Sequence, residues 1–88
     1  MPKMVITHPV VDIDRWLGGK ADRVATFATF ATNVTDYVAA DGSNNVAITG
    51  DVSDMAAAQA IMTSPSPESA AQAERHGVLT PMIAHIEK

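Results

Sequence analysis

The sequence has no cysteine and few basic or aromatic residues, and each scarcity excludes a class of protein. Without cysteine the chain forms neither disulfides nor thiolate metal sites. Six scattered Lys and Arg residues and a net charge of −4 argue against binding to phosphate backbones, so no nucleic-acid partner is expected. No apolar run approaches the ~20 residues that span a membrane, and the N-terminus shows no export signal. We therefore expect a soluble, cytoplasmic protein without a membrane partner.

The length of 88 residues predicts one domain, residues 1–88. A domain of this size buries only about 60–65% of the surface that its unfolded chain exposes, so its stability alone is marginal. Hydrophobic residues make up 47% of the chain, which is sufficient for a folded core. A partner subunit would most easily supply further stability.

The clearest internal pattern is a pair of Asp-containing helix starts, at residues 10–14 and 51–55. Each follows a short apolar run that is typical of a strand, and each leads into a helix and then another such run. The pattern predicts strand–helix–strand twice, with strands at 3–10, 34–40, 45–52 and 78–88 and helices at 13–31 and from 53 or 54 to 76.

Glycine, proline and serine residues mark where these elements break. Gly18-Gly19 predicts a kink or short break in the first helix. Residues 41–44 predict a tight turn between the second and third strands. Residues 63–67 interrupt the second helix, which resumes with Ser66 as its N-cap and ends at Gly77.

The order of elements, βαββαβ, predicts an α+β, ferredoxin-like fold: a four-stranded antiparallel sheet with both helices on one face. Both faces of the strands at 3–10 and 45–52 are largely apolar. A sheet that is covered on one face would then leave apolar surface in water. We expect an identical chain to cover it, in a homodimer that pairs through the sheet faces.

Element order, chain size and the exit of the second helix resemble the dimeric α+β barrel superfamily, which includes the antibiotic-biosynthesis-monooxygenase-like proteins. That exit runs from Ser66-Pro67-Glu68 through Glu74-Arg75-His76-Gly77-Val78 into the last strand. The resemblance spans nearly the whole chain and implies activities from cofactor-independent oxygenation of quinols to haem degradation, cyclisation and isomerisation. The haem-degrading relatives carry an Asn on an early strand and a Trp near the helical His. Neither is present at these positions here, which argues against haem degradation.

Two histidines are the catalytic candidates. His76 lies at the predicted end of the second helix, where the helix dipole favours an imidazolium. It could act as a general acid or base or as an axial ligand, or it could simply be a cation at the helix end beside the Gly77 cap. His8 ends the first strand, with a strand-end or interface role as its alternative. His85 is predicted at the opposite end of the sheet from His8, so the two should not share a metal.

Three aromatic residues are the candidates for substrate binding. Trp16 and Phe27 lie on the apolar face of the first helix, and Trp16 could wall a pocket or anchor the core. Tyr37 alternates with Asp36, so the two should point to opposite faces of the sheet. Tyr37 could bind a ligand oxygen or lie in the dimer interface.

The acidic residues at the helix starts are interpreted as caps, because the further ligands that a metal would need are missing. These residues are Asp12, Asp14, Asp51 and Asp54. No phosphate-binding loop, nucleophile elbow or zinc motif is present. We expect neither a metal nor a cofactor.

Two functions remain open at this point. The chain could be a cofactor-independent monooxygenase, or a related enzyme, that acts on a small apolar or aromatic molecule. It could equally be a non-catalytic homodimer that binds a small molecule or has a structural role. A pocket of at least about 300 Å³ that is lined by Trp16 and a histidine would favour an enzyme or a ligand-binding protein, whereas a filled core would favour a structural role.

Overall fold

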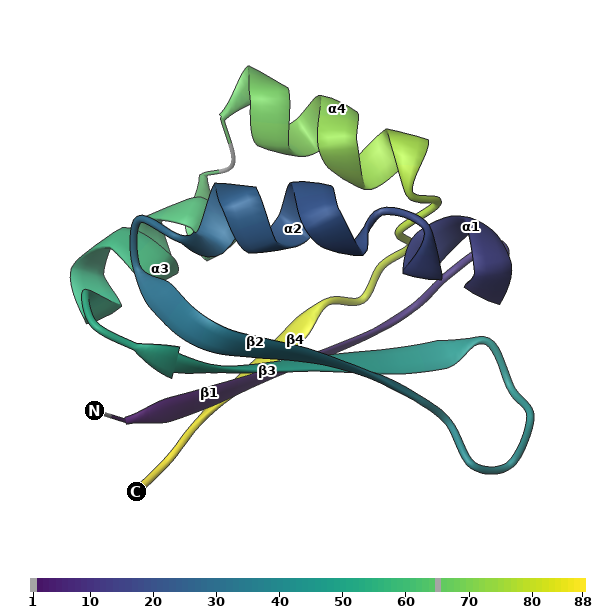
Figure 1. Ribbon diagram of the computed structural model, residues 1–88, viewed down its shortest axis with the longest axis horizontal. Helices are drawn as coiled ribbons and strands as arrows, with labels where there is room; N and C mark the ends of the chain where they lie inside the picture. The colour runs from purple at the N-terminus through teal and green to yellow at the C-terminus, as the bar shows by residue number, and fades with distance from the viewer. Residues whose placement is uncertain (1, 65) are drawn as a thin grey trace.

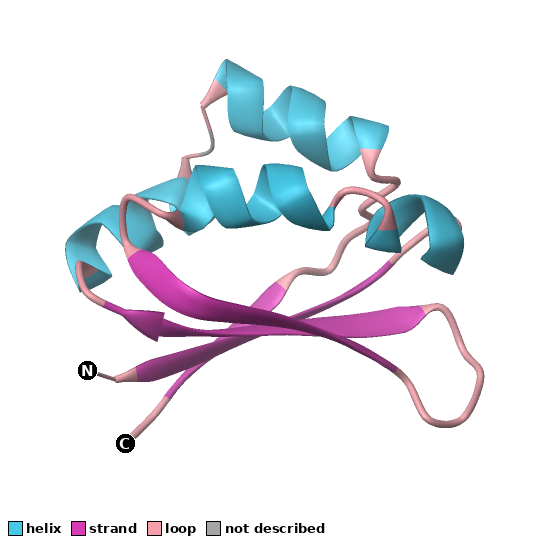
Figure 2. Ribbon diagram, in the orientation of Figure 1, coloured by secondary structure: helices cyan, strands magenta, loops and turns pink. Residues whose placement is uncertain are grey.

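The computed structural model describes residues 2–64 and 66–88 and has the predicted α+β, ferredoxin-like topology (Figure 1). One antiparallel sheet has the strand order β2-β3-β1-β4. All helices lie on one face of this sheet, and the other face is bare (Figure 2). The elements are β1 (Lys3–Pro9), α1 (Ile13–Leu17), α2 (Lys20–Phe27), β2 (Ala31–Val38), β3 (Asn45–Val52), α3 (Met55–Thr63), α4 (Pro67–Arg75) and β4 (Ile83–Ile86).

The first predicted helix is divided at the paired glycines, as expected. Asp12 begins α1 and accepts a hydrogen bond from the Arg15 backbone N–H at 3.1 Å. The helix was predicted to continue to Ala31, but α2 ends at Phe27. The Phe30 carbonyl accepts the backbone N–H of Ser53 at 2.8 Å, which ties this part of the chain to the end of β3. Strand β2 therefore begins at Ala31, three residues before the predicted start.

The second predicted helix is also divided, into α3 and α4. Asp54 caps α3, and Ser66 caps α4 by accepting the Ser69 N–H at 3.1 Å, with Pro67 in the first helical position. Gly77 follows α4 with φ +71°, the left-handed conformation of a helix C-terminus. The predicted interruption at 63–67 includes residue 65, which lies outside the described residues.

The last strand is much shorter than predicted. The strand covers Ile83–Ile86, whereas the prediction covered residues 78–88, although the Leu79 and Glu87 N–H groups also donate to β1 carbonyls. Val78 forms an isolated bridge with Val10, and a cis peptide bond precedes Pro81. Because proline has no N–H for the ladder, the strand can form only beyond it. β4 is an edge strand, as Pro81 indicated.

The alternation of β1 separates the two faces of the sheet. Met4, Ile6 and His8 are buried beneath the helices, whereas Val5 and Thr7 point to the bare face and are half-buried.

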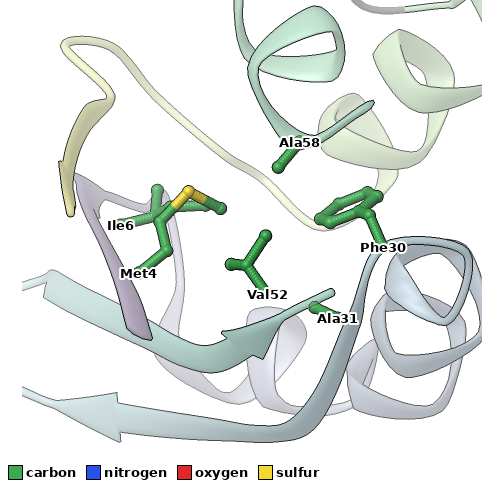
Figure 3. Packing of buried hydrophobic residues seen from close by; sticks show 6 residues of the cluster. All are labelled: Met4, Ile6, Phe30, Ala31, Val52 and Ala58. Carbon is green, nitrogen blue, oxygen red and sulfur yellow. The ribbon is translucent and has the colours of Figure 1, made fainter. Parts of the chain in front are cut away.

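The core has two clusters. The first comprises Met4, Ile6, Phe30, Ala31, Val52 and Ala58 (Figure 3). The second comprises Val10, Trp16, Val46 and Ile48. Within residues 2–64 and 66–88, no helix has the length and apolar character needed to cross a membrane.

Candidate functional site

A cavity of about 130 Å³ lies between the inner face of the sheet and the helices. Its walls come from β1, β3 and all four helices, together with the segment that leads into β4. Four of the five residues that the sequence suggested as site residues line this cavity: His8, Trp16, Phe27 and His76. The fold therefore brings together residues that lie far apart along the chain.

His8 supplies an uncommitted proton acceptor. Its Nδ1 lies 3.0 Å from the Pro9 carbonyl oxygen, and because a carbonyl only accepts, Nδ1 carries the proton. Within the described part of the chain, no hydrogen bond engages Nε2. Burial lowers the pKa of His8 below 6.5, and the nearby charge of Arg23 lowers it further, while the Pro9 hydrogen bond opposes both. His8 is therefore neutral at pH 7, with a lone pair on Nε2.

A buried ion pair lies beside the cavity. The guanidinium of Arg23 and the carboxylate of Asp36 are 2.8 Å apart, and each side chain is only 4% exposed. Arg23 also donates to the Trp16 carbonyl at 2.7 Å and stacks 4.1 Å from the centroid of the indole ring. The same indole and the His8 ring form a T-shaped pair, with 5.9 Å between their centroids. Trp16 therefore connects the cation to the candidate base.

His76 is held by hydrogen bonds on both sides of its ring. Its Nδ1 lies 3.3 Å from a terminal nitrogen of Arg23, which can only donate, so Nδ1 accepts. Its Nε2 then carries the proton toward the Asp22 carboxylate, 3.4 Å away. With both ring nitrogens engaged, His76 is placed to hold Arg23. A catalytic role for His76 stays a prediction, and the geometry favours His8 as the proton acceptor.

Gly19 makes room for the ring of His76. A Cβ atom at this position would overlap the imidazole. The break between α1 and α2 therefore does more than interrupt a helix, because it allows α4 to place His76 against the start of α2.

Three buried polar atoms of this cluster have no hydrogen-bond partner among the described residues: Trp16 Nε1, Arg23 Nε and Asp36 Oδ1. An unsatisfied buried polar group typically costs about 1–3 kcal/mol. The sequence thus keeps polar groups here at the expense of stability. Such local conflicts are expected where function constrains a site.

Tyr37 and the acidic residues that were interpreted as helix caps lie apart from this cluster. Tyr37 points to the bare face of the sheet and is 51% exposed, while its neighbour Asp36 points inward, as the alternation predicted. Asp12 and Asp54 are caps, but Asp51 was wrongly interpreted as one. Asp51 instead lies in β3 and pairs with Lys3 at 2.7 Å. Among residues 2–64 and 66–88, no three potential metal ligands cluster.

The sequence interpretation missed Arg23 and Asp36. The position of Arg23 could have been predicted from the sequence, because it follows Trp16 by seven residues and so lies on the same face of a helical pattern. A charge on an apolar face requires a partner. The inward position of Asp36 followed from its alternation with Tyr37, so the two could have been paired.

Solved structures with the same fold are known, although no protein-family model and no curated protein matches the sequence. A crystal structure of an antibiotic biosynthesis monooxygenase has a TM-score of 0.69 at 11% identity, covering 100% of this chain and 97% of that chain. A proposed antibiotic biosynthesis monooxygenase from Bordetella bronchiseptica has a TM-score of 0.70 at 11% identity, covering 99% and 94%. A similarly described protein from Nitrosomonas europaea has a TM-score of 0.60 at 14% identity, covering 100% and 97%.

At sequence identities of 11% to 14%, the similarity establishes the fold and does not establish an activity. The match extends over the full length of this chain and nearly all of each neighbour. The chain therefore has the same fold as these antibiotic-biosynthesis-monooxygenase structures, which confirms the predicted α+β, ferredoxin-like architecture.

Proposed function

We propose that the chain is an enzyme that binds an aromatic small molecule in the cavity and oxidises it with O2, using His8 as general base and no bound cofactor. One observation carries the proposal: a neutral histidine with a free Nε2 lines a largely apolar cavity. A general base must have its lone pair available at the operating pH, and His8 meets this requirement. The named activity of the structural neighbours agrees with this reaction class.

The chemistry needs a base and a dry site. His8 Nε2 removes the proton of a phenolic hydroxyl, and the resulting phenolate gives one electron to O2. The phenoxyl radical and superoxide then combine at a ring carbon, and the protonated hydroperoxide loses water to leave a quinone. One oxygen atom of O2 enters the product and the other leaves as water. The imidazolium that His8 becomes lies beside the phenolate and offsets part of the cost of forming it.

The test is a matched pair of histidine variants. His8→Gln keeps a polar side chain but removes the base, so kcat for O2 consumption with a hydroquinone should fall by about 10² or more. His85→Gln is the control, because His85 lies on the bare face and outside the cavity. An oxygen electrode measures O2 consumption by the wild type, His8→Gln and His85→Gln, and the comparison shows whether the reaction depends on His8. Equal rates in the His8→Gln variant and the wild type would remove His8 from the mechanism.

A non-catalytic homodimer that binds a small molecule or has a structural role is the second candidate. The cavity volume of about 130 Å³ is well below the roughly 300 Å³ at which ligand pockets commonly begin, which favours the structural role. A ligand-binding protein of this kind would take up hydroquinone under nitrogen and consume no O2 when air is admitted. The oxygen-electrode measurement therefore separates the two candidates.

We further propose that two chains pair through their bare sheet faces. Support comes from the exposed apolar side chains there, since Tyr37 and Ile83 are each about half exposed, at 51% and 49%. Between them lie the half-buried Thr7 and Ala47. A sheet face with this composition is more typical of an interface than of a surface in water.

A further inference from the structure

The volume of the cavity sets the size of the molecule that it can hold. An apolar cavity of about 150 Å³ in another protein stays dry and binds benzene. The cavity here, about 130 Å³, is close to that size. Bulky side chains of the core and helices limit it on several sides, among them Phe27, Ile48 and Ile61. One six-membered ring fits this space, whereas a second fused ring adds four carbon atoms for which little volume remains.

The polar groups of the cavity restrict the charge of the ligand. Among the described lining residues, Arg23 is the one side chain with a permanent charge, and Asp36 neutralises it at 2.8 Å. The terminal nitrogens of Arg23 already contact Asp36, His76 and the Trp16 carbonyl. A carboxylate that entered the cavity would lose its water and meet a cation that Asp36 already neutralises, with only Trp16 Nε1 and Arg23 Nε left without a partner among the described lining residues. The site therefore disfavours an anionic ligand.

His8 determines the direction of the hydrogen bond to the ligand. Its Nδ1–H donates a hydrogen bond to the Pro9 carbonyl, so Nε2 can only accept one. A ligand that meets Nε2 must bring a donor, such as a hydroxyl group. An ether or a plain hydrocarbon of equal size would leave this nitrogen without a partner.

We propose that the ligand is a neutral, single-ring phenol whose hydroxyl donates to His8 Nε2. This inference rests on the proposed function and narrows its substrate class. A hydroquinone with one ring meets every requirement, whereas fused-ring quinols and benzoates do not.

The experiment measures binding to the intact protein under nitrogen by NMR, following the single indole resonance of Trp16, the one tryptophan of the chain. The probes are hydroquinone, 1,4-dihydroxynaphthalene and benzoate. Hydroquinone should bind at least tenfold more tightly than either of the other two. If dihydroxynaphthalene binds as well or better, the size limit is wrong while the proposed function stands. If no probe shifts the resonance, the cavity holds no aromatic ligand and both proposals fail.

A second pair of probes tests the hydrogen bond. Phenol and toluene differ by a hydroxyl in place of a methyl group, so their affinity ratio reports the polar contact. The ratio should fall about fivefold from the wild type to His8→Leu, which removes the acceptor. An unchanged ratio would overturn the assigned contact. Ile61→Ala enlarges the cavity and should improve binding of dihydroxynaphthalene relative to hydroquinone, and no change in that preference would contradict the size argument.

Discussion

A histidine that is buried in the neutral form makes stability depend on pH. Burial lowers the pKa of His8 in the folded chain below its unfolded value of about 6.5. The unfolded state therefore takes up the proton first as the pH falls. The contribution of His8 to stability is complete above about pH 6.5 and is lost as the pH falls from there through the folded pKa.

We predict that the free energy of unfolding of the wild type decreases as the pH is lowered from 7 to 5. His8→Gln should flatten this part of the curve, because it removes the titrating group. Urea denaturation at half-unit pH intervals measures the effect. Asp41 and Asp51 act at lower pH, because hydrogen bonds with Ser43 and with Asn33 and Lys3 hold the pKa values of their carboxyls below 3.8. Identical slopes in the two proteins between pH 7 and 5 would contradict the prediction.

Sequence patterns identified some residues of the candidate site and missed others. Trp16 and Phe27 were suggested by their positions on an apolar face and His8 by its place at the end of the first strand, and all three line one cavity. The bond between Arg23 and Asp36 was missed because burial of a charge depends on a partner from another element, and local pattern does not supply that partner. Tyr37 lies on the opposite face, so a substrate role for it stays a prediction that this cavity does not support.

At the scale of elements, the two glycines between α1 and α2 have different tasks. Gly18 has helical dihedral angles, and an added Cβ there would make only ordinary contacts, at 3.5 Å. Gly19 also avoids the left-handed region, with φ −91°, but its Cβ would overlap the ring of His76. Substitution of each glycine by alanine is therefore a matched experiment, in which only the change at Gly19 disturbs the contacts between His76 and Arg23.

We predict that Gly19→Ala lowers the free energy of unfolding by about 1–3 kcal/mol, because His76 must leave its place between Arg23 and Asp22. Gly18→Ala should be neutral or raise it by about 0.4–1 kcal/mol through the unfolded state. Urea denaturation of both variants provides the comparison. Equal effects of the two substitutions would show that the His76 ring does not depend on Gly19.

Element types and caps could be predicted more reliably than element ends. Asp54, Ser66 and Gly77 act locally, and each was predicted in the role that it has. The ends of α2 and β4 depend on distant partners. Phe30 is tied to Ser53, and β4 forms only where β1 accepts it. No local pattern carries the link between Phe30 and Ser53, so the predicted helix was four residues too long. Pro81 is a local signal for the late start of β4, whereas no local signal marks its end at Ile86.

At the scale of the whole molecule, the bare sheet face leads to a test of assembly. We predict a native mass of twice the chain for the wild type, because the exposed apolar side chains are removed from water when two sheets pack. Tyr37→Glu and Ile83→Glu place a charge on this face and should shift the mass to that of one chain.

The control is Val24→Glu, which adds the same charge to α2 at a side chain that is 41% exposed. It should leave the mass unchanged. A wild-type mass of one chain, or a Tyr37→Glu variant that keeps the double mass, would exclude pairing through this face.

The two walls of the cavity differ in how firmly they are built. His8 lies on β1, which is hydrogen-bonded to a strand on each side, whereas the helices of the opposite wall have only 5 to 9 residues. Helices this short are not stable by themselves and depend on their contacts. On the proposed function, the opening that admits a ligand should therefore come from the four helices, while His8 keeps its position on β1. Ligand entry and the alignment of the proposed base would then depend on different elements of the fold.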